Sequence, residues 1–193
     1  MVRTRTHAME RLDIDRVAFH EVNAARWTDF ERLFESSGGP KSCWCMVWRA
    51  TAEEAKHSSG ASRKAAMKRR VAAGIPVGLL GYLDCEPVAW CSVAPRSTYR
   101  RLSDGDGSDK DVWSIVCFFV ARRLRKRGMM RRFIRAAVEH ARARGATAVE
   151  AYPVDEDSPS YRFMGFVSTF KNSGFREVGR AGKRRHIMRL ELK

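Results

Sequence analysis

The apolar and polar residues of this chain follow two periods that divide it into short elements. Alternating or continuous apolar runs predict strands over 12–22, 76–83, 87–94, 112–120, 147–154, 175–180 and 186–192. Apolar residues three and four positions apart predict helices over 23–36, 51–73, 128–144 and 158–174, the second interrupted around 58–60. The order is β–α–α–β–β–β–α–β–α–β–β, which predicts an α/β fold of the α+β type.

Two segments carry most of this prediction. The nearly continuous apolar run over 112–120 is typical of a central strand that is covered on both faces. With the helix over 128–144 and the strand over 147–154 it forms a strand–helix–strand crossover, so we expect parallel pairing of its two strands. For the last helix, Ser158-Pro159 supplies a start signal and Gly174 an end signal. Its predicted buried face consists of Phe163, Phe166, Val167 and Phe170.

Composition places the chain among folded domains. It has 193 residues, 44% of them hydrophobic and 31% charged, which favours one domain over 12–193 after a flexible tail at 1–11. No apolar run approaches the ~20 residues of a membrane helix, and no apolar stretch follows the basic N-terminus, so we expect neither a membrane span nor a secretory signal. The five cysteines suggest reduced thiols and a cytoplasmic location. Cys43-Trp44-Cys45 lacks a second metal-binding pair, so no metal is expected.

The charge of the chain favours a polyanionic or phosphorylated ligand. The formal net charge is +15, which suits either nucleic acid or a phosphorylated cofactor. No helix-turn-helix, zinc-finger or aromatic RNA-binding signature accompanies it, so nucleic acid is the weaker alternative.

The placement of the charge is more informative than its total. Between Arg122 and Arg132, seven of eleven residues are Arg or Lys, and they lie at the start of a predicted helix. A helix N-terminus carries partial positive charge, so cations there cost about a few tenths of a kcal/mol each unless an anion is bound. We therefore infer an anion site, against the alternative of a merely solvated charged face. Gly128 allows the backbone to approach that anion closely.

This segment resembles a motif of the GNAT acetyltransferase superfamily. Arg125-Lys126-Arg127-Gly128-Met129-Met130 is similar to the family's Arg/Gln-x-x-Gly-x-Gly/Ala, matching at Arg125 and Gly128 and departing at Met130. The order of elements is also the family's order, and Phe170-Lys171-Asn172-Ser173-Gly174-Phe175 resembles its Tyr-x-x-x-Gly-Phe junction. The resemblance covers about residues 12–192. It implies a mixed central sheet of six to seven strands and acetyl-CoA (coenzyme A) as co-substrate, without a metal.

The resemblance further implies an N-acetyltransferase in which a primary amine attacks the thioester directly. The oxyanion donor would be a backbone N–H near Phe119 or Val120. The family's acidic tyrosine is replaced by Phe170, and a common asparagine seven residues earlier is replaced by Phe163. The implied cofactor contacts are Phe118, Phe119, Val120, Arg125, Lys126, Arg127, Gly128, Met129, Met130 and Arg131.

Glu150 and Tyr152 are the candidates for proton transfer. They lie two positions apart on a predicted strand and so share a face. Burial of a carboxylate there would move its pKa toward a useful range. The alternative is a structural ion pair between Glu150 and an arginine, with Tyr152 packing beside it. Asp155, just past the strand, is a third candidate.

The acceptor side is implied by family geometry to lie near residues 43–49. Trp44, Trp48 and Arg49 would form a wall for a small-molecule amine; alternatively, both tryptophans are core residues. Homodimer formation would follow family habit. The competing functions are a non-catalytic acyl-CoA sensor with the same fold and a basic nucleic-acid-binding module.

Overall fold

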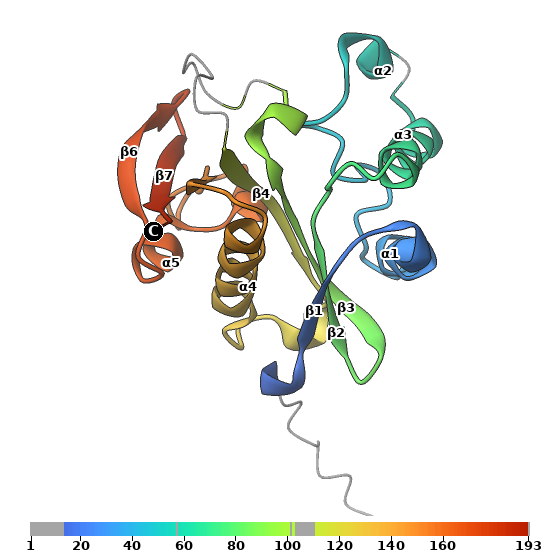
Figure 1. Cartoon of the computed structure of the whole chain (residues 1–193), viewed down its shortest axis with the longest axis horizontal. Coiled ribbons are helices and arrows are strands. Elements are labelled where there is room, and N and C mark those ends of the chain that lie inside the picture. Colours follow the sequence, from blue (N-terminus) through green and yellow to red (C-terminus); the bar gives the residue numbers. More distant parts are fainter. Residues whose placement is uncertain (1–13, 57, 101, 103–110, 193) are drawn as a thin grey trace, which may run out of the picture.

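A seven-stranded mixed sheet, seen in a computed structural model, forms the centre of the molecule (Figure 1). The structure describes residues 14–56, 58–100, 102 and 111–192. The strands are ordered β1-β2-β3-β4-β5-β7-β6, which confirms the expected α/β class and strand number. Their bounds are β1 (Ala18–Glu21), β2 (Leu79–Leu83), β3 (Glu86–Pro95), β4 (Val112–Val120), β5 (Ala148–Ala151), β6 (Arg176–Ala181) and β7 (Arg185–Glu191).

Helices cover both faces of this sheet. They are α1 (Trp27–Glu35), α2 (Ala52–Lys56), α3 (Gly60–Ala72), α4 (Met129–Ala143) and α5 (Val167–Lys171). Figure 1 shows α4 and α5 on one face and α1 and α3 on the other. No helix in the described part of the chain is long and apolar enough to span a bilayer.

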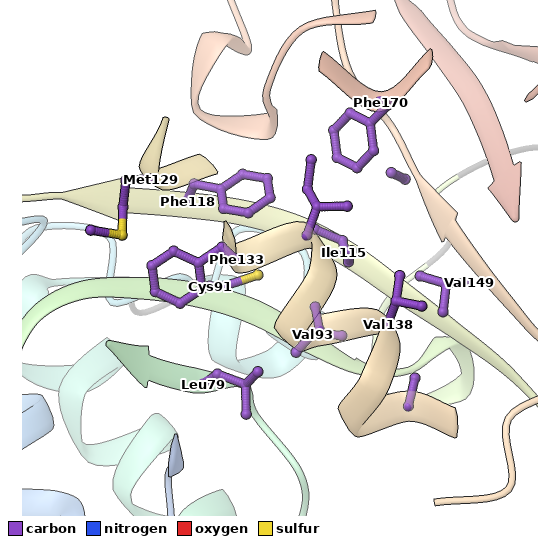
Figure 2. Close-up of a cluster of buried hydrophobic side chains, with 14 of the residues drawn as sticks. Leu79, Cys91, Val93, Ile115, Phe118, Met129, Phe133, Val138, Val149 and Phe170 are labelled. Carbon is purple, nitrogen blue, oxygen red and sulfur yellow. The ribbon is translucent and has the colours of Figure 1, made fainter. Parts of the chain in front are cut away.

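Strand alternation divides the core between the two faces. On β3, Cys91 and Val93 point toward α4, where they meet Phe133 (Figure 2). Trp90, directly before Cys91 in sequence, points the other way and packs against Phe30 of α1. Side chains of a strand alternate between its faces, so the continuous apolar runs expected for central strands supply both cores.

The strands β4 and β5 are the only parallel pair among the described strands, as the predicted crossover through α4 requires. They pair only over 112–115 and 148–151. Beyond these residues β4 continues to Val120 without β5, while Val154 makes an isolated parallel bridge with Phe166. The last part of β4 therefore has an edge that pairs with no strand among the described residues and faces a gap in the sheet.

The predicted helix over 158–174 is wrong for its first half. Only α5 is α-helical there, preceded by the 3₁₀ turn η5 (Arg162–Met164). Gly165 has a φ of 90°, and its carbonyl accepts a hydrogen bond from the Val154 amide at 3.0 Å. The backbone at 165–167 therefore pairs with Val154, next to β5, and does not continue a helix. Phe163, expected on a buried helix face, is 41% exposed.

The first strand is shorter than predicted because residues 14–16 form the 3₁₀ turn η1 (Ile14–Arg16). Arg132 of α4 holds this turn, since its guanidinium pairs with the Asp15 carboxylate and donates to the Val17 carbonyl at 3.1 Å. The expected tail at 1–11, and most of the loop over 101–110, lie outside the described residues.

Gly78, just before β2, gives the first test of this packing. It has a φ of 149°, and a Cβ there would lie 2.1 Å from the Cys91 carbonyl oxygen. We expect Gly78→Ala to lower the free energy of unfolding by at least about 3 kcal/mol, because overlap adds to backbone strain. Gly145, with a φ of 80° and open space around it, is the matched control, and Gly145→Ala should cost about 1–2 kcal/mol. Equal losses in urea unfolding would contradict the close approach.

Candidate active site

The turn before α4 presents a row of backbone donors. Gly128 precedes the helix with a φ of 82°, and Lys126 also has a positive φ of 60°. The amides of Arg131 and Arg132 donate to the Gly128 carbonyl. Over 126–130, by contrast, the backbone N–H groups have no hydrogen-bond acceptor among the described residues. Such a row at a helix N-terminus is a site for an anion.

Part of the predicted cationic cluster is used inside the protein. Arg123 pairs with Glu86 at 2.6 Å, and Arg132 holds η1 as described above. The Arg125 side chain turns back, and its Nε donates to the Val120 carbonyl at 2.8 Å. Four side chains of the cluster have no ion pair or hydrogen bond with any described residue: Arg122, Lys126, Arg127 and Arg131.

A pocket of about 680 Å³ opens beside these donors, and we call it the α4 pocket. Of the predicted cofactor residues, it collects all but Arg127. Its lining consists of Phe118, Phe119, Val120, Arg125, Lys126, Gly128, Met129, Met130, Arg131, Arg162, Phe163, Phe166 and Thr169. A neighbouring cavity of about 360 Å³ shares Arg131 and adds residues from α4, from the turn after α5 and from β7.

Three lining residues of the α4 pocket were not predicted from the sequence. Arg162, Phe166 and Thr169 belong to the region that was expected to be one continuous helix. The guanidinium of Arg162 lies 4.9 Å from the centre of the Phe166 ring. The bend at Gly165 brings this pair to the pocket, and the glycine itself is the one signal of that bend in the sequence.

A second cavity, of about 300 Å³, lies beside β4, and we call it the β4 cavity. It shares three residues with the α4 pocket: Phe118, Phe119 and Phe163. The remaining lining residues are Pro40, Cys43, Cys45, Val47, Trp48, Ser92, Val116 and Cys117. The two spaces therefore meet along the unpaired end of β4.

Of the three predicted acceptor residues, only Trp48 lines the β4 cavity. Trp44 is buried against Phe34 and Trp27, with ring centroids 5.1 and 6.0 Å away, which is the core role considered as the alternative. Arg49 is buried and donates to four neutral oxygen atoms, which belong to Val77, Ser92, Thr98 and Tyr99. Burial lowers the pKa of this guanidinium.

Glu150 and Tyr152 share one face of the sheet, as expected, but line neither cavity. Glu150 is buried between Arg96 at 3.1 Å and Arg189 at 3.2 Å, and the Tyr152 hydroxyl donates to it at 2.9 Å. Burial raises the pKa of Tyr152. These contacts fit a structural ion pair. Asp155 contacts His186 at 3.1 Å.

The direction of the β4 backbone determines which amide could be the oxyanion donor that the family resemblance implies. The Ala121 amide donates to the Val88 carbonyl, on the β3 side. Successive amides of a strand point in opposite directions, so the Val120 N–H points away from β3, toward the gap. Phe170 is fully buried against Phe118 and Phe175 and has no polar group to donate.

No group of three or more His, Cys, Asp or Glu side chains in the described ranges is placed to hold a metal ion. The α4 pocket instead suits a phosphorylated organic ligand, since it combines amide donors, unpaired cations and aromatic walls.

Replacement of Glu150 distinguishes a structural ion pair from a role in proton transfer. We expect Glu150→Gln to lower the free energy of unfolding by about 3 kcal/mol, because Arg96 and Arg189 lose a buried partner. Glu191 also pairs with Arg189 but is 69% exposed at its side chain, so Glu191→Gln should cost about 0.5 kcal/mol or less. Thermal unfolding and turnover per folded molecule are measured together. Lost turnover at unchanged stability would instead support proton transfer by Glu150.

The chain is similar to proteins of a known family. Residues 27–166 match the model of the acetyltransferase (GNAT) family. No curated protein sequence matches the chain significantly.

Solved structures share the fold at low sequence identity. The aminoglycoside acetyltransferase AAC(6′)-Ib in complex with coenzyme A has a TM-score of 0.59 and 16% identity, covering 91% of this chain and 94% of that one. A ribosomal-protein-alanine N-acetyltransferase from Brucella melitensis has a TM-score of 0.56 and 16% identity, with coverage of 91% and 99%. The PaiA N-acetyltransferase from Thermoplasma acidophilum, in complex with coenzyme A, has a TM-score of 0.56 and 9% identity, with coverage of 91% and 99%. The family match over more than half of its length shows that this chain belongs to the GNAT acetyltransferase family.

Proposed function

We propose that this protein binds acetyl-CoA at the start of α4 and transfers the acetyl group to a primary amine of a small molecule. The observation that carries the proposal is the row of unpartnered N–H groups over 126–130 at the edge of the α4 pocket. Lys126 and Arg131, both without an ionic partner among the described residues, line the same pocket. Backbone donors together with flexible cations suit a pyrophosphate.

The shared wall of the two cavities supports direct transfer. A thioester held in the α4 pocket near Phe118 and Phe119 would be reached by an amine from the β4 cavity, since both spaces include these residues. The amine nitrogen attacks the thioester carbonyl, the C–S bond breaks and an amide forms. The Val120 N–H, which points into the gap, is the proposed donor to the oxyanion.

The departing thiolate has no aromatic hydroxyl at the family's usual position, because Phe170 stands there and is buried. We therefore propose that water supplies its proton. Arg125 acts indirectly: by donating to the Val120 carbonyl it fixes the end of β4. Cytoplasmic location and homodimer formation stay predictions.

Two measurements test the proposal. Calorimetric titration with acetyl-CoA measures binding, and release of free coenzyme A thiol across a panel of amines measures transfer. Binding without thiol release for any amine would favour the non-catalytic sensor. Steeply salt-dependent binding to DNA, with no response to acetyl-CoA, would favour the nucleic-acid-binding module.

Arg131 at the start of α4 and Arg142 in its last turn form a matched pair, since both are exposed and belong to one helix. We expect Arg131→Gln to weaken acetyl-CoA binding about tenfold, or about 1.4 kcal/mol. The same change should raise the stability of the free protein by a few tenths of a kcal/mol, because a cation leaves the positive end of the helix dipole. Arg142→Gln should leave affinity unchanged and lower stability slightly. Equal affinity losses for both variants in calorimetry would contradict a phosphate site at Arg131.

A further inference from the structure

The β4 cavity contains no general base among the described residues that line it. The described lining residues are apolar or neutral, without Asp, Glu, His, Lys or Arg among them. Contact with Cys45, together with burial, raises the pKa of the Cys43 thiol. Contact with Cys117 and burial likewise raise the pKa of Cys45. Both thiols are therefore protonated and uncharged near neutral pH.

A buried positive charge, Arg49, lies behind this wall. Ser92 lines the β4 cavity, and its hydroxyl accepts a hydrogen bond from Arg49 at 3.2 Å. The other partners of Arg49 are neutral oxygen atoms, and its Nε is buried without a partner among the described residues. A guanidinium one hydrogen bond away from the cavity, with no carboxylate partner in the described ranges, disfavours an ammonium group inside.

These two features limit the kind of amine that can react. Only an unprotonated amine has the lone pair needed for attack. An alkylamine with a pKa of about 10.4 is neutral in only about one molecule in 2,500 at pH 7. Within the described part of the chain, the lining of the β4 cavity offers it neither a base to remove the proton nor a carboxylate to hold the cation. An aromatic amine is neutral at that pH and needs neither.

The shape and surface of the cavity fit an aromatic ring. Its volume is about 300 Å³, and four aromatic residues contribute to its wall: Trp48, Phe118, Phe119 and Phe163. Ring–ring contacts between aromatic groups contribute beyond area burial alone. The shared residues Phe119 and Phe163 lead from this cavity to the α4 pocket.

We propose that the acceptors of this protein are weakly basic aromatic amines, which enter the β4 cavity as neutral molecules. The inference rests on the acetyl transfer proposed above. The amine nitrogen forms a bond to the acetyl carbonyl as the C–S bond breaks. Its surplus proton passes to water, and the coenzyme A thiolate takes a proton from water. The products are an N-aryl acetamide and free coenzyme A.

Aniline and cyclohexylamine form a matched pair of acceptors, since they have similar ring size and different basicity. Thiol release is followed with the full chain and acetyl-CoA between about pH 6 and pH 9. At pH 7 we expect aniline to react at least about 100-fold faster. The aniline rate should be nearly independent of pH, whereas the cyclohexylamine rate should rise about tenfold per pH unit as its neutral fraction grows. Equal rates at pH 7, or faster transfer to a polycation such as spermidine, would overturn the inference while leaving acetyl transfer established.

A carboxylate added to the cavity gives the converse test. Val47 lines the β4 cavity and is 51% exposed, so polar replacements there are tolerated. Val47→Glu should raise the cyclohexylamine-to-aniline rate ratio about tenfold, since it can hold or deprotonate the ammonium. Val47→Gln introduces a side chain of nearly the same size as glutamate but without its charge, so it should leave the ratio unchanged. The same ratio in both variants would count against the inference.

A different result would contradict the acetyl transfer itself. If acetyl-CoA binds in calorimetry but no amine causes release of the coenzyme A thiol, the proposed transfer fails.

Discussion

The early separation of β4 from β5 is the constraint on which the rest of the molecule depends. Parallel pairing lasts for four residues on each strand, and the remainder of β4 keeps one edge without a strand partner in the described structure. An unpaired edge inside a sheet must be satisfied by something else. Here the edge borders both cavities, and the helix that follows β4 begins beside it. One departure from regular pairing thus brings backbone donors, cations and an apolar chamber to the same place.

Charge in this protein is divided between structural and available groups. Arg132, Arg123 and Arg125 hold, respectively, η1, the β2–β3 turn at Glu86 and the end of β4. Lys126 and Arg131 lie on the α4 pocket without such partners in the described chain. The net charge of the sequence therefore overstates the charge available for a ligand. A cation of the first kind lies within hydrogen-bond distance of a carboxylate or carbonyl from another segment, and a cation of the second kind has no such partner among the described residues.

Prediction from the sequence was most accurate where apolar residues kept a single helical spacing over a long element. The helix predicted over 128–144 is observed as α4 (Met129–Ala143), whose buried residues share one helical spacing: Met129, Phe133, Ile134, Ala137, Val138 and Ala141. Phe163, Phe166, Val167 and Phe170 have helical spacing too, yet a bridge to Val154 and the bend at Gly165 prevail. Short elements are decided by such tertiary contacts, which spacing does not record.

The same limit applies to the site. Nine of ten predicted cofactor residues line one pocket, because a glycine turn before a helix is a local feature. Trp44, Arg49 and Glu150 look equally functional in sequence, but their partners come from distant segments: Phe34 for Trp44, Tyr99 for Arg49, and Arg96 with Arg189 for Glu150. Whether a polar or aromatic residue is structural or faces a ligand depends on those long-range neighbours.

The position of Phe163, in the wall shared by both cavities, has a thermodynamic consequence. The side chain is partly exposed and belongs to a short turn, so its rotamer is less constrained than those of the buried rings around it. Any shift of the ring when one cavity fills changes the free volume of the other. Occupancy of the two sites is then linked, and by reciprocity each ligand alters the affinity of the other by the same factor. A single ring can in this way set the preferred order in which two ligands are taken up.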